Sequence, residues 1–155
     1  MEEEILSVDK NKIHKVLAHS YSAYLFFFLV GVFLDLFFSF KVSDNPVIIP
    51  TGFIFLILGT LLIIWAQRTS RNLKKENISK ETFYCGPYRF TRTPTSFGLF
   101  FLILGFGMIT NELLIIFCSL ISFFVAKMIF LNEEEKILAL KYGAPYLEYK
   151  KAVKF

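Results

Sequence analysis

The chain has 155 residues, the size of one domain, and 55% of them are apolar, including 20 phenylalanines. This apolar fraction exceeds that of an ordinary soluble domain and indicates a membrane protein. The formal net charge is +4, but the aromatic residues fall inside apolar stretches and the charges at their ends, which argues against a nucleic-acid binder.

Residues 10–19, which precede the first apolar stretch, are basic and predict a short interfacial helix. Four apolar stretches follow, at residues 21–40, 47–66, 95–110 and 113–131. About 20 apolar residues in a helix cross a hydrocarbon core, so each stretch is a predicted transmembrane helix. The third is short and is expected to form a hairpin with the fourth. The first stretch begins too late and is too long for a cleavable signal peptide.

Two features inside the predicted helices bear on their packing. Gly52 and Gly59 are seven residues apart, as are Gly98 and Gly105, so each pair lies on one helix face and predicts close helix packing. Asp35 is the acidic residue within a predicted span. Because it lies near the outer end of its helix, we expect it to reach water or contact another helix, and a functional role is the alternative.

Basic residues are frequent before the first helix, between the second and third, and after the fourth, but rare in the two other turns. The positive-inside rule therefore predicts that both termini are cytoplasmic. The predicted fold is all-α: one polytopic membrane bundle over residues 1–155, with four transmembrane helices and a cytoplasmic C-terminal helical tail. Cys85 and Cys118 then lie on opposite sides of the membrane, so no disulfide is expected, and no Cys/His spacing suggests a metal.

Two polar segments, residues 80–98 and 133–149, are predicted to lie on the cytoplasmic side. In the first, Gly86-Pro87 forces a turn, and Pro94 suits the first turn of the next helix. The free N–H groups at that helix start favour an anion. In the second, residues 133–135 are three consecutive glutamates, and we expect one of them to face inward. Gly143 is predicted to end that helix in a left-handed cap.

The two segments together resemble a known superfamily. The pattern G-P-Y-R-x-x-R-x-P-x-x-x-G, then a hydrophobic hairpin, then E-E-x-x-L-x-x-x-[FY]-G-x-x-Y-x-x-Y is similar to that of the isoprenylcysteine carboxyl methyltransferases and phospholipid methyltransferases. Here it covers Gly86 to Gly98, then Glu134-Glu135, Leu138, Tyr142-Gly143, Tyr146 and Tyr149. The resemblance implies a membrane enzyme that binds S-adenosylmethionine in a cytoplasmic pocket. It also implies a lipid or lipidated, isoprenylcysteine-like acceptor that enters from the bilayer.

The resemblance also implies which residues form the site. The expected cofactor contacts are Lys80, Glu81, Thr82, Phe83, Tyr88, Thr93, Pro94, Thr95, Ser96 and Glu134. Arg92 and Lys127 are weaker expectations for acceptor binding. No catalytic side chain is assigned, because the sulfonium of the cofactor already activates its methyl group and the protein must mainly hold donor and acceptor in line.

The chain departs from the superfamily pattern at three positions. Thr93 stands where His or Asn is usual, Ser96 where Tyr is common, and Phe130 where the prenylcysteine enzymes have an Arg. Two alternatives therefore stay open. One is an NADPH-dependent, steroid-reductase-like membrane enzyme with the same hairpin. The other is a catalytically inert membrane scaffold of the same fold. The sequence does not identify the methyl acceptor or the oligomeric state.

Overall fold

A computed structural model describes residues 2–72 and 86–153, and every regular element in these ranges is a helix. In chain order they are α1 (Glu2–Phe38), α2 (Ile48–Asn72), η1 (Gly86–Arg89), α4 (Pro94–Thr110), α5 (Leu113–Val125), η2 (Ala126–Phe130), α6 (Leu131–Tyr142) and α7 (Ala144–Ala152). The element η1 is a 3₁₀ turn, and η2 is a π-helical turn that joins α5 to α6. The predicted all-α class is confirmed for the described residues.

The helix α1 differs from the prediction at its N-terminal side. A separate interfacial helix was expected at residues 10–19, but one continuous helix runs from Glu2 to Phe38. No proline interrupts this stretch, so nothing in the backbone forces a break. The helix ends where Ser39 adopts a left-handed conformation (φ 40°) and its N–H donates to the Asp35 carbonyl at 2.9 Å.

Within the described part of the chain, three stretches of helix are long and apolar enough to cross a membrane: Ala18–Phe38, Ile48–Ser70 and Leu113–Glu133. The fourth predicted span corresponds to α4, an apolar helix of 17 residues that is shorter than these. Only 17%, 11% and 29% of the three apolar stretches are buried within the protein. Large apolar side chains such as Phe26 and Leu36 therefore form the outer surface of the bundle, as in a protein whose solvent is lipid.

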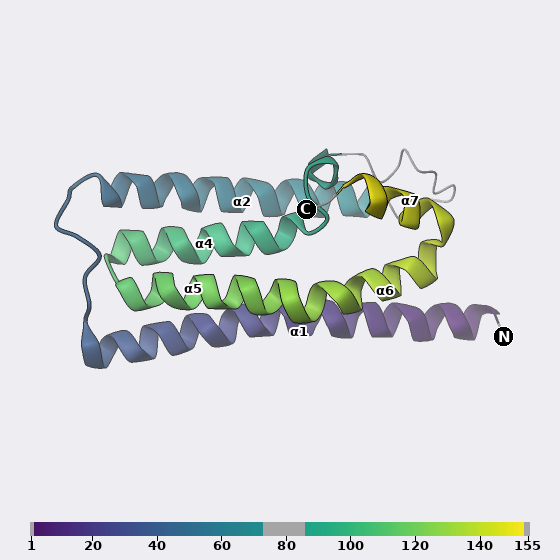
Figure 1. The fold of residues 1–155 in the computed structure, drawn as a ribbon, viewed down its shortest axis with the longest axis horizontal. Helices are drawn as coiled ribbons and strands as arrows, with labels where there is room; N and C mark the ends of the chain where they lie inside the picture. The colour runs from purple at the N-terminus through teal and green to yellow at the C-terminus, as the bar shows by residue number, and fades with distance from the viewer. Residues whose placement is uncertain (1, 73–85, 154–155) are drawn as a thin grey trace.

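The helices pack in the order α2, α4, α5, α1, so that each contacts its neighbour along most of its length (Figure 1). Residues 39–47 and 111–112 connect helices at one end, here named the loop end (Figure 1). The elements η1, α6 and α7 lie at the opposite end, here named the tail end, together with the N-terminus (Figure 1). Both described ends of the chain therefore lie toward the same end of the bundle.

The helices α2 and α4 approach closely through facing glycines. A Cβ atom on Gly59 would lie 2.7 Å from the Gly98 carbonyl oxygen, and one on Gly105 would lie 2.6 Å from the Gly52 carbonyl oxygen. These distances are too short for a real side chain, so the backbones meet only because the four positions lack Cβ atoms. The close packing predicted from the glycine spacing is thus confirmed, and it fixes the start of α4 against α2.

The loop end is closed by contacts between its two turns. The Leu113 N–H donates to the Phe40 carbonyl at 2.8 Å, and Lys41 and Glu112 form an isolated β-bridge. Asp35 is buried at 8% exposure, and its side chain contacts that of Glu112. A hydrogen bond to Asp35, then burial, raises the pKa of Glu112 above its ordinary value. Asp35 therefore makes a contact inside the bundle, with the turn that leads into α5, as expected for one of its two structural roles.

Candidate functional site

The turn that carries the Gly-Pro-Tyr-Arg motif is fixed against the end of α2. Gly86 has a left-handed backbone (φ +61°), and a Cβ atom there would lie 2.5 Å from the Thr69 hydroxyl oxygen and 3.1 Å from the Trp65 indole nitrogen. Glycine alone satisfies both the conformation and the space. Pro87 is buried directly after it. This turn therefore has a defined position at the tail end and holds Tyr88 there.

The C-terminal helix α7 docks onto this turn. The Tyr149 hydroxyl donates a hydrogen bond of 2.6 Å to the Tyr88 carbonyl oxygen. Tyr146, Tyr149 and Val153 are buried together, and Tyr88 and Ala139 pack against them. Gly143 ends α6 with the positive φ (63°) that the predicted glycine cap requires, but its ψ of −137° lies outside the left-handed helical region, and the chain folds back there. The two polar segments of the sequence thus converge at one place.

An ion-pair network joins the start of α4 to the tail. Glu135 of α6 is 6% exposed, and one of its carboxylate oxygens pairs with Arg92. The other oxygen lies 2.6 Å from the Lys150 ammonium of α7. A buried carboxylate is stable only when it is paired in this way. Arg92 therefore contacts the tail rather than the cavity described below.

Glu135 was not among the expected site residues. The carboxylate chosen from the resemblance was Glu134, which lies on α6 but whose side chain is outside the described part of the structure. Glu133 is exposed. Ala139, four residues later, packs against the tyrosine cluster, and residues four apart share a helix face, so the structure places Glu135 on the side of α6 that faces the tail. The three consecutive glutamates of the sequence did not indicate this.

The start of α4 has backbone N–H groups that its own helix does not use. The first hydrogen bond of the helix runs from the Phe97 N–H to the Thr93 carbonyl, and the Thr93 side chain makes no capping bond. The N–H groups of Thr95 and Ser96 precede that bond, and Pro94 has none. Such a helix start is suited to bind an anion.

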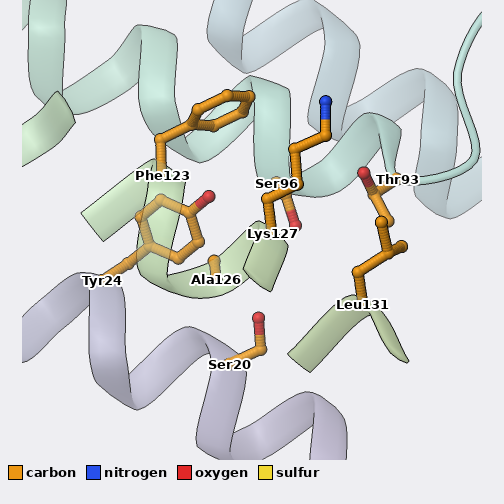
Figure 2. A pocket seen from close by; sticks show the side chains of 8 residues that line it. All are labelled: Ser20, Tyr24, Thr93, Ser96, Phe123, Ala126, Lys127 and Leu131. Atoms are coloured by element: carbon orange, nitrogen blue, oxygen red, sulfur yellow. The ribbon is translucent and has the colours of Figure 1, made fainter. Parts of the chain in front are cut away.

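A small cavity lies beside this helix start, between α1, α4 and the helix that runs through η2 (Figure 2). It brings together Thr93, Ser96 and Lys127 from the expected site, with Phe123 and Leu131 beside them. It also includes residues that the sequence did not suggest, which are Ser20 and Tyr24 of α1 and Ala126 of η2. Its volume is about 10 Å³, the room of about one water molecule.

The other expected site residues lie elsewhere. Tyr88, Pro94 and Thr95 are at the tail end but do not line the cavity. The stretch Lys80 to Phe83 is outside the described residues. The π-helical turn η2 supplies Ala126 and Lys127 to the cavity wall, and single π turns inside α-helices are frequent at functional sites.

Comparison with known proteins gives one result that matches this geometry. A family model described as phospholipid methyltransferase matches residues 47–145, which run from the start of α2 to the start of α7. No curated protein and no solved structure matches the chain. The matched region covers more than half of the chain and contains the first polar segment of the sequence pattern and the second as far as residue 145. The chain therefore belongs to the phospholipid methyltransferase family.

Proposed function

We propose that the protein is an integral membrane methyltransferase that uses S-adenosylmethionine and acts on a lipid or a lipidated acceptor. One observation carries the proposal. The Gly-Pro-Tyr-Arg turn, the start of α4 and the acidic start of α6 converge at the tail end, through the Arg92–Glu135 ion pair and the bond from Tyr149 to Tyr88. The family pattern requires these two segments to act together, and segments at opposite ends of the bundle would exclude a common site.

The residues at the start of α4 fit the methionine part of the cofactor. The uncapped N–H groups of Thr95 and Ser96 are suited to hold its carboxylate, and the hydroxyls of Thr93 and Ser96 lie on the adjoining cavity. Thr93 and Ser96 can therefore supply hydrogen bonds in place of the residues usual in the superfamily. This assignment depends on the observation that the Thr93 side chain makes no capping hydrogen bond to the N–H groups at the start of α4.

Two further residues complete the proposed cofactor site. The Tyr88 ring offers an aromatic surface for adenine. Glu134 would balance the positive charge of the cofactor. When bound, the cofactor supplies an activated methyl group on a sulfonium. The chain's own task is then to position the acceptor and to exclude water, which a bundle with an apolar outer surface can do for a molecule that arrives from the bilayer.

The proposal is tested by the binding of labelled S-adenosylmethionine and of NADPH to the full chain in detergent. We expect saturable binding of S-adenosylmethionine, lost in Tyr88→Ala and in Glu134→Gln. Glu133→Gln is the matched control, because Glu133 is exposed, and it should bind normally. Binding of NADPH instead would support the reductase-like alternative, and binding of neither would support the inert scaffold. A methylation assay across a lipid extract then identifies the species that gains a methyl group.

A further inference from the structure

Ser20 and Tyr24 of α1 are turned into the bundle, whereas large apolar side chains next to them on the same helix face outward. Ser20 and Tyr24 are each 2% exposed, whereas Leu25, Phe26 and Leu29 are more than half exposed. Residues four apart share a helix face, so the two hydroxyl groups lie one above the other on the inner side of α1. Burying polar side chains here needs a reason other than apolar packing.

Both side chains border the small cavity. In Figure 2, Ser20 and Tyr24 come from α1 on one side, and Thr93 and Ser96 come from α4 on the other. The cavity is therefore the place where α1 meets the predicted cofactor region. With room for about one water molecule, it can admit one small polar group of a ligand and not a whole lipid head group.

The hydroxyls on the cavity wall differ from hydroxyls elsewhere in the bundle. Thr60, Ser119 and Ser122 each donate to a carbonyl of their own helix. Among the described residues, the hydroxyls of Ser20 and Ser96 make no such bond. A hydroxyl that does not donate to its own helix can donate to a ligand in the cavity.

The charged side chains that line the cavity indicate which chemical group of a ligand would bind there. Among the described residues that line the cavity, Lys127 is the charged one and none is a carboxylate. Its ammonium nitrogen lies 5.9 Å from the centre of the Phe123 ring and extends toward α4, on the side of the cavity away from Ser20 (Figure 2). A wall that carries hydroxyl donors and an ammonium favours a ligand oxygen with negative charge.

The helix α1 lies outside the region matched by the family model, which begins at residue 47. We propose that Ser20 and Tyr24, together with Lys127, form a specificity site that selects an acceptor with an anionic oxygen group, a carboxylate or a phosphate. This inference rests on the proposed function in that the bound molecule is the methyl acceptor. Ser20 and Tyr24, which make part of the selection, lie outside the residues that the family model matches.

The test measures direct binding of three short amphiphiles to the full chain in a neutral detergent, without cofactor. Octyl phosphate and octanoate carry the anionic group, and octyl glycerol ether is the neutral probe. We expect the anionic probes to bind at least about 10-fold more tightly than the neutral one. Ser20→Ala, Tyr24→Phe and Lys127→Met should each weaken the anionic probes by about 10-fold, the effect of one hydrogen bond to a charged group. They should leave the neutral probe unchanged.

Two matched control variants show whether a loss of probe binding comes from the specificity site or from misfolding of the protein. Ser22→Ala removes an exposed hydroxyl of the same helix that donates to the His19 carbonyl, and Lys136→Met removes an exposed ammonium. Both should bind all three probes normally. Tyr24→Phe keeps the ring in place, so it still tests the inference if Ser20→Ala does not fold. Equal binding of neutral and anionic probes, or equal losses in the controls, would overturn it.

The same data identify the source of the anionic group and separate this inference from the proposed function. Tighter binding of octyl phosphate supports a phospholipid acceptor, and tighter binding of octanoate supports a lipidated carboxylate. Selective anionic binding without any S-adenosylmethionine binding would keep the specificity site and reject the methyltransferase. Binding of S-adenosylmethionine without a preference for the anionic probes would support the methyltransferase and reject the specificity site.

Discussion

Glu135 is the residue through which the tail is attached to the rest of the protein. Its two carboxylate oxygens contact Arg92 at the start of α4 and Lys150 of α7. The Arg92 side chain is 15% exposed and that of Lys150 is 44% exposed. The pair with Arg92 therefore contributes most of the stabilisation, because an exposed pair is screened by solvent.

Replacing Glu135 with Gln should destabilise the protein. The change removes the carboxylate that pairs with the largely buried Arg92 guanidinium, at a cost of about 3 kcal/mol in the free energy of unfolding. Thermal unfolding in detergent measures the effect, and hydrogen exchange should show earlier opening of α7. Glu133→Gln is the control, because Glu133 is exposed and its replacement should change stability by less than about 0.5 kcal/mol. Equal losses in the two variants would contradict the assigned network.

At the scale of the elements, the contact between α2 and α4 depends on glycine. Replacing Gly105 with Ala would place a Cβ atom 2.6 Å from the Gly52 carbonyl oxygen and 2.8 Å from the Leu56 nitrogen. Both atoms belong to the backbone, so the helices must separate, and we expect a loss of about 1–3 kcal/mol. Thermal unfolding measures it. Thr60→Ala, on an exposed part of α2, should be close to neutral, and a fully stable Gly105→Ala variant would show that the helices are not in this contact.

The contact between α1 and the α4–α5 turn is expected to depend on pH. The hydrogen bond to Asp35 raises the pKa of Glu112, so the folded state favours the protonated acid. This contribution to stability is full below the ordinary pKa of 4.5 and is lost as the pH rises through the higher value of the folded state. Lys41 is the cation that faces Glu112 and opposes the shift.

Glu112→Gln isolates this effect, because the amide can still donate a hydrogen bond but does not titrate over the same range. Thermal unfolding of both proteins from about pH 4 to pH 8 gives the comparison. The stability of the parent protein relative to Glu112→Gln should fall as the pH rises. A difference that stays constant, or that increases with pH, would show that Glu112 does not bind its proton more tightly in the folded state.

At the scale of the whole molecule, the arrangement of the helices predicts which end of the bundle faces the cytoplasm. The N-terminus, α6 and α7 lie at the tail end, and so do the C-terminal end of α2 and the turn η1, with their basic residues Arg68 and Arg89 (Figure 1). The positive-inside rule then predicts that the tail end is cytoplasmic. A single cysteine at Ser43 or at Lys151, in a chain with Cys85 and Cys118 replaced, tests this.

An impermeant maleimide should label the cysteine at Ser43 in intact cells and the cysteine at Lys151 only after the membrane is opened. Labelling of both in intact cells would contradict a bundle that crosses the bilayer. Labelling of Lys151 alone would show the opposite orientation. Either result would also change the side from which the cofactor reaches the proposed site.

Most of the bundle could be predicted from the sequence, because long apolar runs and glycine spacing are local signals. The runs at 47–66 and 113–131 fall within the helices of the structure. The boundaries were less accurate, as in α2, which continues to Asn72 because the basic residues that follow the apolar run still favour a helix.

The site was predictable only in part. Thr93, Ser96 and Lys127, which the resemblance assigns to one site, line one cavity, and their roles in binding stay predictions. The role of Glu135 was missed, because three consecutive glutamates give no local sign of which one faces the tail. The contribution of Ser20 and Tyr24 was also missed, since it depends on how α1 packs against α5 and η2. Contacts between segments that are distant in the sequence cannot be predicted from a short window of residues.

The π-helical turn η2 has a consequence for mutations that change chain length. A regular α-helix advances by about 100° of azimuth per residue. The π-helical turn holds one residue more than an α-helical turn, so a deletion within 126–130 would restore regular winding and leave α6 facing as before. Deleting Asn132, within α6, would instead rotate the residues that follow by about 100°. The apolar spans would still insert, but Glu135 would turn away from Arg92 and α7 would leave its tyrosine cluster. Membrane assembly and site assembly can thus be uncoupled by the loss of a single amino acid.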